Sequence, residues 1–122
     1  MASLRLIVLT NPVEGREDEY NDWYSDRHLD DVLAVKGFRA AQRFEFRPGK
    51  LSGDAPFRYL AVYEVEGMTV EAAEAALLAT AADKDLMPIS NAMARERATW
   101  WFEAVTDRVK ASAGESAGVA GG

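Results

Sequence analysis

Apolar and polar residues follow two different periods along this chain, one typical of strands and one typical of helices. Residues 4–10 form a short, continuous apolar run that ends at Asn11-Pro12, which indicates a central strand buried on both faces. Residues 38–47 and 57–66 alternate between apolar and polar side chains, and residues 99–105 are rich in aromatic side chains, so each segment predicts a further strand. Within residues 38–47, the alternation places on one face Phe38, Ala40, Gln42, Phe44 and Phe46.

Two predicted helices separate these strands. The first spans residues 17–35, with acidic side chains in its first turn, as the helix dipole favours, and Gly37 just beyond its end. The second begins after Thr69, a suitable N-cap, and runs to about Ala82. Residues 83–98 are expected to be irregular or partly helical, because Pro88 limits any helix there.

The order of these elements, β-α-β-β-α-β, predicts an α+β fold of the ferredoxin-like type. In that fold a four-stranded antiparallel sheet carries both helices on one face. The other face would stay uncovered, and its apolar side chains predict a homodimer through the sheet face, which closes a dimeric α+β barrel. The chain has 122 residues, and we expect residues 1–110 to form this single domain and residues 111–122 to be a loosely ordered Ala/Gly/Ser tail.

Composition narrows the possible partners. The net charge of −6 leaves no basic stripe for phosphate groups, so we expect no nucleic-acid partner and no anionic membrane surface. The sequence has no cysteine, which excludes disulfides, thiolate nucleophiles and iron–sulfur clusters. The apolar run near the N-terminus is shorter than a membrane span and lacks the pattern of a signal peptide, so a cytoplasmic protein is expected.

His28 is the only histidine of the chain, and it lies on the first predicted helix. On a helical wheel with about 100° per residue, His28 falls between Tyr24 and Val32 inside the buried arc, whereas Asp26 and Asp30 lie opposite. Imidazole titrates near neutral pH, so a histidine at this position suits general acid–base chemistry. The alternative is a core histidine that bonds a backbone carbonyl.

Other polar side chains near His28 extend this hypothesis. Asp31 would orient the imidazole from the next turn, and the phenols of Tyr20 and Tyr24 would donate to a developing oxyanion. Asn11 would bind a substrate oxygen together with Tyr24. A lone histidine with divergent aspartates makes a poor metal site, so we predict neither a metal nor a cofactor.

Several large side chains are candidates for lining a substrate pocket between the sheet and the helices. Trp23 and Arg27 flank the buried arc of the first helix, and Tyr63 and Trp100 lie on predicted strands. The alternative for these side chains is simple packing in the core or in the dimer interface.

Several short stretches near the N-terminus resemble one protein family. They are Asn11-Pro12-Val13-Glu14-Gly15-Arg16-Glu17, Tyr20-Asn21-Asp22-Trp23-Tyr24, His28-Leu29-Asp30-Asp31-Val32-Leu33, Gly37-Phe38 and Arg43-Phe44. In these stretches the chain resembles the EthD-like group of dimeric α+β barrel proteins. The resemblance implies a homodimer with a pocket between the sheet and the helices of each subunit, and a functional role for His28.

The favoured hypothesis is a cofactor-independent enzyme with lyase, isomerase or cyclase chemistry. His28 would act as general acid or base on a small, largely apolar carbonyl or phenolic compound. A cofactor-free monooxygenase would need the same base and pocket, and a non-catalytic dimeric small-molecule-binding protein would need only the pocket. A haem-dependent member of the same superfamily would have only His28 as its axial ligand. The sequence leaves these alternatives open.

Overall fold

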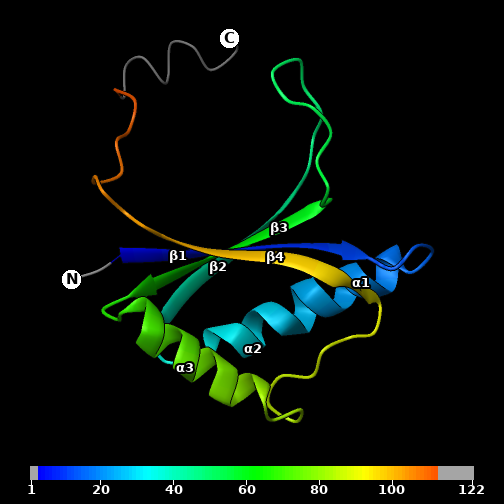
Figure 1. Ribbon diagram of the computed structural model, residues 1–122, viewed down its shortest axis with the longest axis horizontal. Helices are drawn as coiled ribbons and strands as arrows, with labels where there is room; N and C mark the ends of the chain where they lie inside the picture. Colours follow the sequence, from blue (N-terminus) through cyan, green and yellow to red (C-terminus); the bar gives the residue numbers. More distant parts are fainter. Residues whose placement is uncertain (1–2, 113–122) are drawn as a thin grey trace.

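The computed structural model describes residues 3–112, which fold into one sheet and two helical segments. The elements in chain order are β1 (Ser3–Pro12), α1 (Glu17–Trp23), the π-helical turn η1 (Tyr24–His28), α2 (Leu29–Leu33), β2 (Phe38–Glu45), β3 (Tyr59–Glu66), α3 (Val70–Ala81) and β4 (Met93–Glu103). Since α1, η1 and α2 follow one another without a break, the order is the predicted β-α-β-β-α-β (Figure 1). Most of the predicted tail, residues 113–122, lies outside the described residues.

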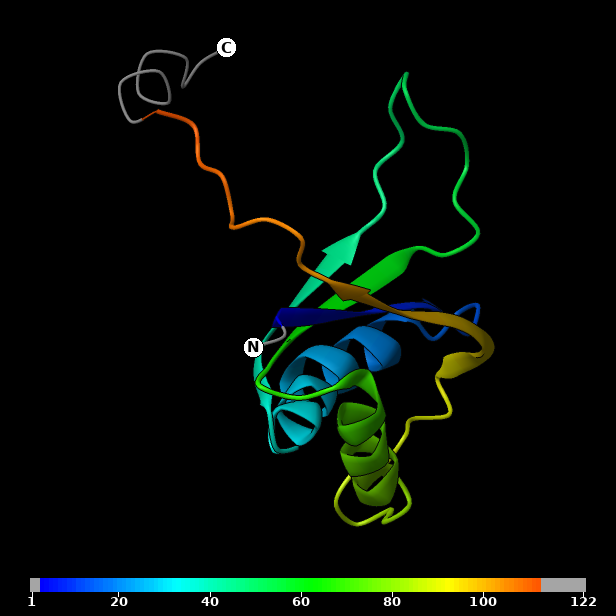
Figure 2. The same cartoon turned by 60° about the vertical axis from the view of Figure 1, so that its left-hand side comes forward.

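The four strands form a single antiparallel sheet in the order β2-β3-β1-β4. Figures 1 and 2 show the helices packed against one face of this sheet, while the opposite face carries no helix. The predicted α+β class and ferredoxin-like arrangement are therefore confirmed. The long connection between β2 and β3 extends away from the body of the molecule on the side without helices (Figure 2).

The core lies between the sheet and the helices, and its side chains come from nearly every element. In β1, Leu4, Leu6 and Thr10 are buried beneath the helices, whereas Ile7 and Leu9 on the other face are only half-buried. The prediction that this strand is buried on both faces is thus correct only for the helix-covered face of the single chain. The remaining buried apolar side chains are Tyr20, Tyr24, Val32, Val35, Phe38, Ala61, Tyr63, Val65, Ala73, Met87 and Ala92.

The π-helical turn lets four residues of the first helical segment share one face. Tyr20, Tyr24, His28 and Val32 recur at intervals of four, and in a regular α-helix each such step would rotate the side chain by about 40°. The backbone N–H of Leu29 donates to the Tyr24 carbonyl, five residues earlier, so the turn contains an additional residue. This wider turn offsets the rotation, and Tyr20, Tyr24 and Val32 are all buried against the sheet.

The second helix matches its prediction closely. The Thr69 hydroxyl accepts a hydrogen bond of 3.1 Å from the backbone N–H of Ala72, so Thr69 is the N-cap of α3. The helix continues to Ala81, and Ala73 packs into the core with no exposed surface. A small side chain at this position lets the helix approach the sheet.

Two strand predictions are wrong in part. β4 begins at Met93, opposite Pro12 of β1, and so includes residues 93–98, the end of the segment expected to be irregular. The charged side chains of these residues are compatible with a strand because β4 is an edge strand where solvent reaches them. In β2, the pairing with β3 shifts between Phe38 and Ala40. This bulge changes which residues face the helices, so Phe38 is buried while Phe44 lies exposed on the opposite face.

Gly37 connects α2 to β2 in a conformation that favours glycine. Its φ is 88°, and a Cβ atom at this position would collide with the Met68 side chain. Replacing Gly37 with alanine is expected to lower the free energy of unfolding by about 1–3 kcal/mol, measured by urea denaturation. Gly15→Ala is the matched control, because Gly15 has a similar φ of 83° but open space around it. Equal losses in the two variants would contradict the role assigned to the Met68 contact.

The face of the sheet without helices presents a continuous apolar surface, which we call the outer apolar face. Cross-strand pairing places its side chains on the same side of the sheet. Its members are Ile7, Leu9, Phe44, Leu60, Val62, Ala98, Trp100 and Phe102. Within residues 3–112, no helix has both the length and the apolar composition needed to cross a membrane.

Candidate functional site

A cavity of about 300 Å³ lies between the sheet and the helices that cover it. Strands β1, β3 and β4 form its floor, the first helical segment and α3 form its roof, and the connection between α3 and β4 closes one side. Its lining residues are Leu6, Val8, Tyr24, His28, Val32, Tyr63, Glu74, Leu77, Leu78, Ala81, Met87, Ile89, Arg97, Thr99 and Trp101. A mainly apolar cavity with a few polar groups is typical of a site for a small organic molecule.

His28 contributes the cavity's only imidazole, packed between two aromatic rings. Its ring stacks on Trp23 with the centroids 4.6 Å apart, and it meets the edge of Tyr24 at 4.9 Å. The Nδ1 atom is buried and has no hydrogen-bond partner within the described residues. A core histidine normally bonds a backbone carbonyl, so this unpaired nitrogen argues against a purely structural role.

Burial keeps this imidazole neutral. Desolvation is the main cause that lowers the pKa of His28 to about 4, the charge of Asp31 opposes it, and the charges of Arg43 and Arg97 add to the lowering. At pH 7 His28 is therefore uncharged, with one nitrogen available to accept a proton and the other carrying one.

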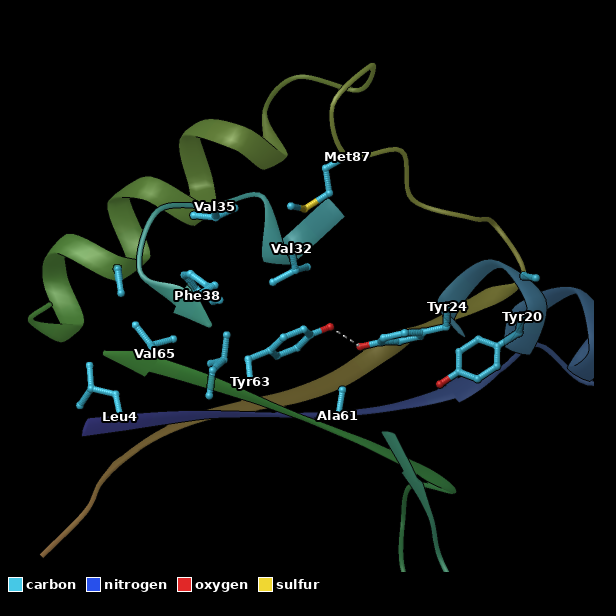
Figure 3. Close-up of a cluster of buried hydrophobic side chains, with 13 residues drawn as sticks. Leu4, Tyr20, Tyr24, Val32, Val35, Phe38, Ala61, Tyr63, Val65 and Met87 are labelled. Carbon is cyan, nitrogen blue, oxygen red and sulfur yellow. Dashed lines mark hydrogen bonds between the residues drawn. The ribbon is translucent and has the colours of Figure 1, made fainter. Parts of the chain in front are cut away.

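Two tyrosine hydroxyls lie beside the histidine. Figure 3 shows the Tyr24 and Tyr63 rings pointing toward each other, with the Tyr63 hydroxyl donating to the Tyr24 hydroxyl across 3.5 Å. This long hydrogen bond is weak, so either hydroxyl can turn toward a ligand at small cost. Burial raises the pKa of Tyr24 to about 12 and raises that of Tyr63 as well. Both phenols therefore stay protonated and remain hydrogen-bond donors.

Asp31 does not form the hydrogen bond with the imidazole that the sequence suggested. Its carboxylate accepts a bond of 3.1 Å from the Arg27 guanidinium, one turn earlier, and so makes an ion pair on the helix surface. Asp31 acts on His28 only through its charge, which raises the pKa of the imidazole. Arg27 also donates to the carbonyl of Asp85 and does not line the cavity.

Trp23 and Arg27 hold the connection between α3 and β4, which forms one wall of the cavity. The Trp23 indole N–H donates to the Pro88 carbonyl at 3.1 Å, and Arg27 bonds the same connection at Asp85. That connection carries Met87 and Ile89 into the cavity wall. The two residues predicted to bind substrate therefore fix a wall of the cavity, and Trp23 in addition fixes the orientation of the imidazole by stacking on it.

Three other predicted substrate-binding residues lie outside this cavity. The Asn11 side chain bonds the backbone at Pro56 and Arg58, so it anchors the connection between β2 and β3. Tyr20 is fully buried, and its hydroxyl bonds the Thr10 hydroxyl. Trp100 pairs with Ile7 and lies on the outer apolar face. Its neighbour Trp101 pairs with Leu6 and lines the cavity, because successive side chains of a strand point to opposite faces.

Arg43 lies beside the cavity, enclosed by tyrosines. Its guanidinium is 4.5 Å from the Tyr24 ring centroid, 5.1 Å from that of Tyr59 and 5.3 Å from that of Tyr20. It also donates to Asn21 and Ser25. These contacts occupy the guanidinium in holding β2 to the helix, so Arg43 is engaged within the protein.

Several lining residues were not predicted from the sequence, above all two charged residues, Arg97 and Glu74. The Glu74 carboxylate accepts a hydrogen bond of 3.0 Å from the Trp101 indole. The one available signal was alternation in β4, where Arg97, Thr99 and Trp101 share a face. Across residues 3–112, no three His, Asp or Glu side chains gather closely enough to hold a metal ion.

Comparison with known proteins finds similarity in structure rather than in sequence. No family model and no curated protein matches the chain. An EthD family protein of Bacillus halodurans superimposes with a TM-score of 0.60 at 17% identity, over 86% of this chain and 100% of that one. An EthD-like protein of Ralstonia eutropha also gives 0.60, at 20% identity, over 88% and 96% of the two chains.

A third structure, described as a dimeric ferredoxin-like protein of unknown function from Thermobifida fusca, gives a TM-score of 0.53. It is 13% identical and covers 84% of this chain and 92% of that one. At these identities the comparisons establish a shared fold. The EthD-like fold recognised from the sequence is therefore confirmed.

Proposed function

We propose that this protein is a cofactor-independent enzyme that transfers protons within a small, largely apolar carbonyl or phenolic compound. The observation that carries the proposal is a neutral, buried imidazole with an unpaired Nδ1, on the wall of an apolar cavity beside two protonated phenols. An enzyme of this kind needs a base, an oxyanion donor and a site from which most water is excluded.

In the proposed reaction, a nitrogen of His28 takes a proton from the carbon next to the substrate carbonyl. The electron pair of the broken C–H bond moves onto the carbonyl oxygen, so an enolate and an imidazolium form together. The hydroxyls of Tyr24 and Tyr63 donate hydrogen bonds to the enolate oxygen.

In an isomerisation, the imidazolium returns the proton to another carbon of the enolate as the carbonyl re-forms. In a cyclisation, the enolate carbon forms a bond to a second carbonyl carbon of the substrate, the π electrons of that carbonyl move to its oxygen, and the imidazolium protonates this oxygen. In a lyase reaction, the enolate re-forms the carbonyl as the bond to a leaving group on the next carbon breaks, and the imidazolium protonates the departing group.

Deuterium exchange tests this chemistry without knowledge of the natural substrate. The probe is 2-tetralone, an apolar ketone with acidic α-protons, incubated with the protein in D₂O and followed by NMR. We expect the protein to accelerate the exchange well beyond an equal concentration of free imidazole. A rate equal to that of free imidazole would count against proton-transfer catalysis.

One observation favours a second candidate, a non-catalytic binding protein. With its pKa lowered to about 4, His28 is a weak base in the free protein, whereas a general base works best with a pKa near the working pH. Binding alone would give retention of 2-tetralone without exchange. A cofactor-free monooxygenase, another of the alternatives, would consume oxygen in the same assay, and we expect no oxygen uptake.

We also propose that the protein forms a homodimer through the outer apolar face. The face is large and apolar on an otherwise acidic protein, and such patches usually mark an interface. We expect the Trp100→Glu variant to be monomeric by light scattering while the wild-type protein is dimeric. Leu86→Glu is the matched control on the helical side, since Leu86 is 56% exposed and Trp100 54%. A monomeric wild-type protein would contradict the proposal.

A further inference from the structure

Arg97 places a positive charge at the cavity that the chemistry proposed above does not use. It pairs with Thr10 across β1 and β4, and directly paired residues of antiparallel strands point to the same face. Thr10 is buried beneath the helices, so the Arg97 side chain also lies on the helix-covered face. There it lines the cavity together with Thr99 and Trp101, although the residue as a whole is exposed to solvent.

No group of the protein neutralises this charge. Within residues 3–112, every ion pair involves another arginine, and no carboxylate lies within 4.0 Å of Arg97. The other charged lining residue, Glu74, accepts its hydrogen bond from Trp101. Trp101 lies four residues after Arg97 in β4, so the backbone positions of Arg97 and Trp101 are roughly 13 Å apart. The guanidinium therefore has all its donors available, and the rest of the lining is largely apolar.

The charge of Arg97 acts on the same side chains that carry the proposed chemistry. It lowers the pKa of both His28 and Tyr24, which places all three within electrostatic range of one another. A ligand that fills the cavity beside His28 therefore lies close to this guanidinium. An arginine with free donors binds carboxylates and similar planar anions through paired hydrogen bonds.

We infer that the ligand of this cavity is a small acid, with an apolar body in the cavity and an anionic oxygen group, a carboxylate or an acidic enol, held by Arg97. The inference rests on the proposed function, in that the same cavity holds the substrate. It narrows the substrate class from neutral carbonyl or phenolic compounds to acidic ones. The net charge of −6 disfavours anions in general, so a preference for an acid has to come from a local cation.

A matched pair of probes tests the inference by binding alone. 2-Naphthoate and 2-naphthamide have nearly the same shape, but only the first is an anion at pH 7. We expect the wild-type protein to bind 2-naphthoate about tenfold more tightly than 2-naphthamide in calorimetry at low salt. The preference should shrink as ionic strength rises, because Arg97 is exposed to solvent.

The Arg97→Gln variant should bind the two probes equally while it keeps the wild-type affinity for 2-naphthamide. Arg95→Gln is the control, since it removes the same charge from the same strand at a position that lines a separate groove beside Asn11 and not the cavity. Circular dichroism establishes that both variants fold. Equal wild-type affinities, no binding of either probe, or a preference that survives Arg97→Gln would each overturn the inference.

These outcomes are independent of the catalytic proposal. If 2-naphthoate is preferred through Arg97 but 2-tetralone is not exchanged, the acid-binding cavity stands and the proton-transfer function fails. If exchange depends on His28 but the acid is not preferred, the function stands and the inference fails.

Discussion

The His28→Gln variant is expected to catalyse deuterium exchange into 2-tetralone at least about 100-fold more slowly than the wild-type protein. Glutamine is similar to histidine in size and keeps a polar group in the same place, but its amide cannot take up a proton at neutral pH. The loss corresponds to about 3 kcal/mol of transition-state stabilisation. NMR measurement of exchange in D₂O gives both rates directly, and binding of 2-naphthamide establishes that the cavity of the variant is intact.

Two aspartates of the same helical segment provide the controls. Asp26→Asn removes an exposed carboxylate from the π-helical turn and should leave the exchange rate unchanged. Asp31→Asn removes the charge that raises the pKa of His28, so we expect a weaker base and a rate reduced only a few-fold. Full exchange by the His28→Gln variant, or an equal loss in Asp26→Asn, would show that the imidazole is not the base.

Acid is expected to destabilise the wild-type protein through His28, by about 3 kcal/mol between pH 6.5 and pH 4. The pKa of His28 is about 4 in the folded protein, mainly because of burial, and near its ordinary value of about 6.5 in the unfolded chain. Below pH 6.5 the unfolded chain therefore binds a proton that the folded protein does not. The contribution of His28 to the free energy of unfolding is therefore fully present above pH 6.5, decreases as the pH falls from 6.5 to 4, and changes no further below pH 4.

Urea denaturation at a series of pH values separates this contribution from that of the carboxylates. The free energy of unfolding should fall less steeply with decreasing pH in His28→Gln than in the wild-type protein. The difference between the two curves isolates the histidine, because all carboxylates are common to both. Parallel curves would mean that His28 titrates normally in the folded protein.

The fold was predictable because its signals are local. Apolar runs, the alternation of strands and the Thr69 cap each lie within a few residues, and the order of elements then leaves few topologies. The N-cap and the bounds of α3 agree closely with the prediction. The start of β4 was missed because its charged side chains obscure the apolar pattern, although pairing with β1 holds the segment in the sheet.

The sequence predicted the site only for residues that lie on one and the same helical segment. The helical wheel brought Tyr24 and His28 together, and the structure places both on the cavity wall. The positions of the other candidate side chains depend on contacts that the sequence pattern does not reveal. Asp31 pairs with Arg27 rather than with the imidazole, and Trp101 rather than Trp100 faces the cavity. In a strand with two adjacent tryptophans, a shift of one position exchanges their faces, and the sequence alone does not fix that register.

The cavity walls formed by α3 and by the connection after it had no sequence signal at all. Leu77 lines the cavity only because α3 crosses the sheet at that point, and Met87 because Trp23 and Arg27 bond its connection to the first helix. For Arg97, alternation in β4 indicates only that it shares a face with Trp101, and the pairing of two strands far apart in the chain decides that this face lines the cavity.

The most direct test of the central claim, that His28 is a neutral group facing a ligand cavity, is an NMR titration of its imidazole. The chain has one histidine, so after removal of any affinity tag a single ring signal reports on it. We predict a titration midpoint near pH 4, and a shift of the signal when 2-naphthoate or 2-tetralone is added at pH 7. A midpoint near 6.5, with a signal that neither compound moves, would contradict the account.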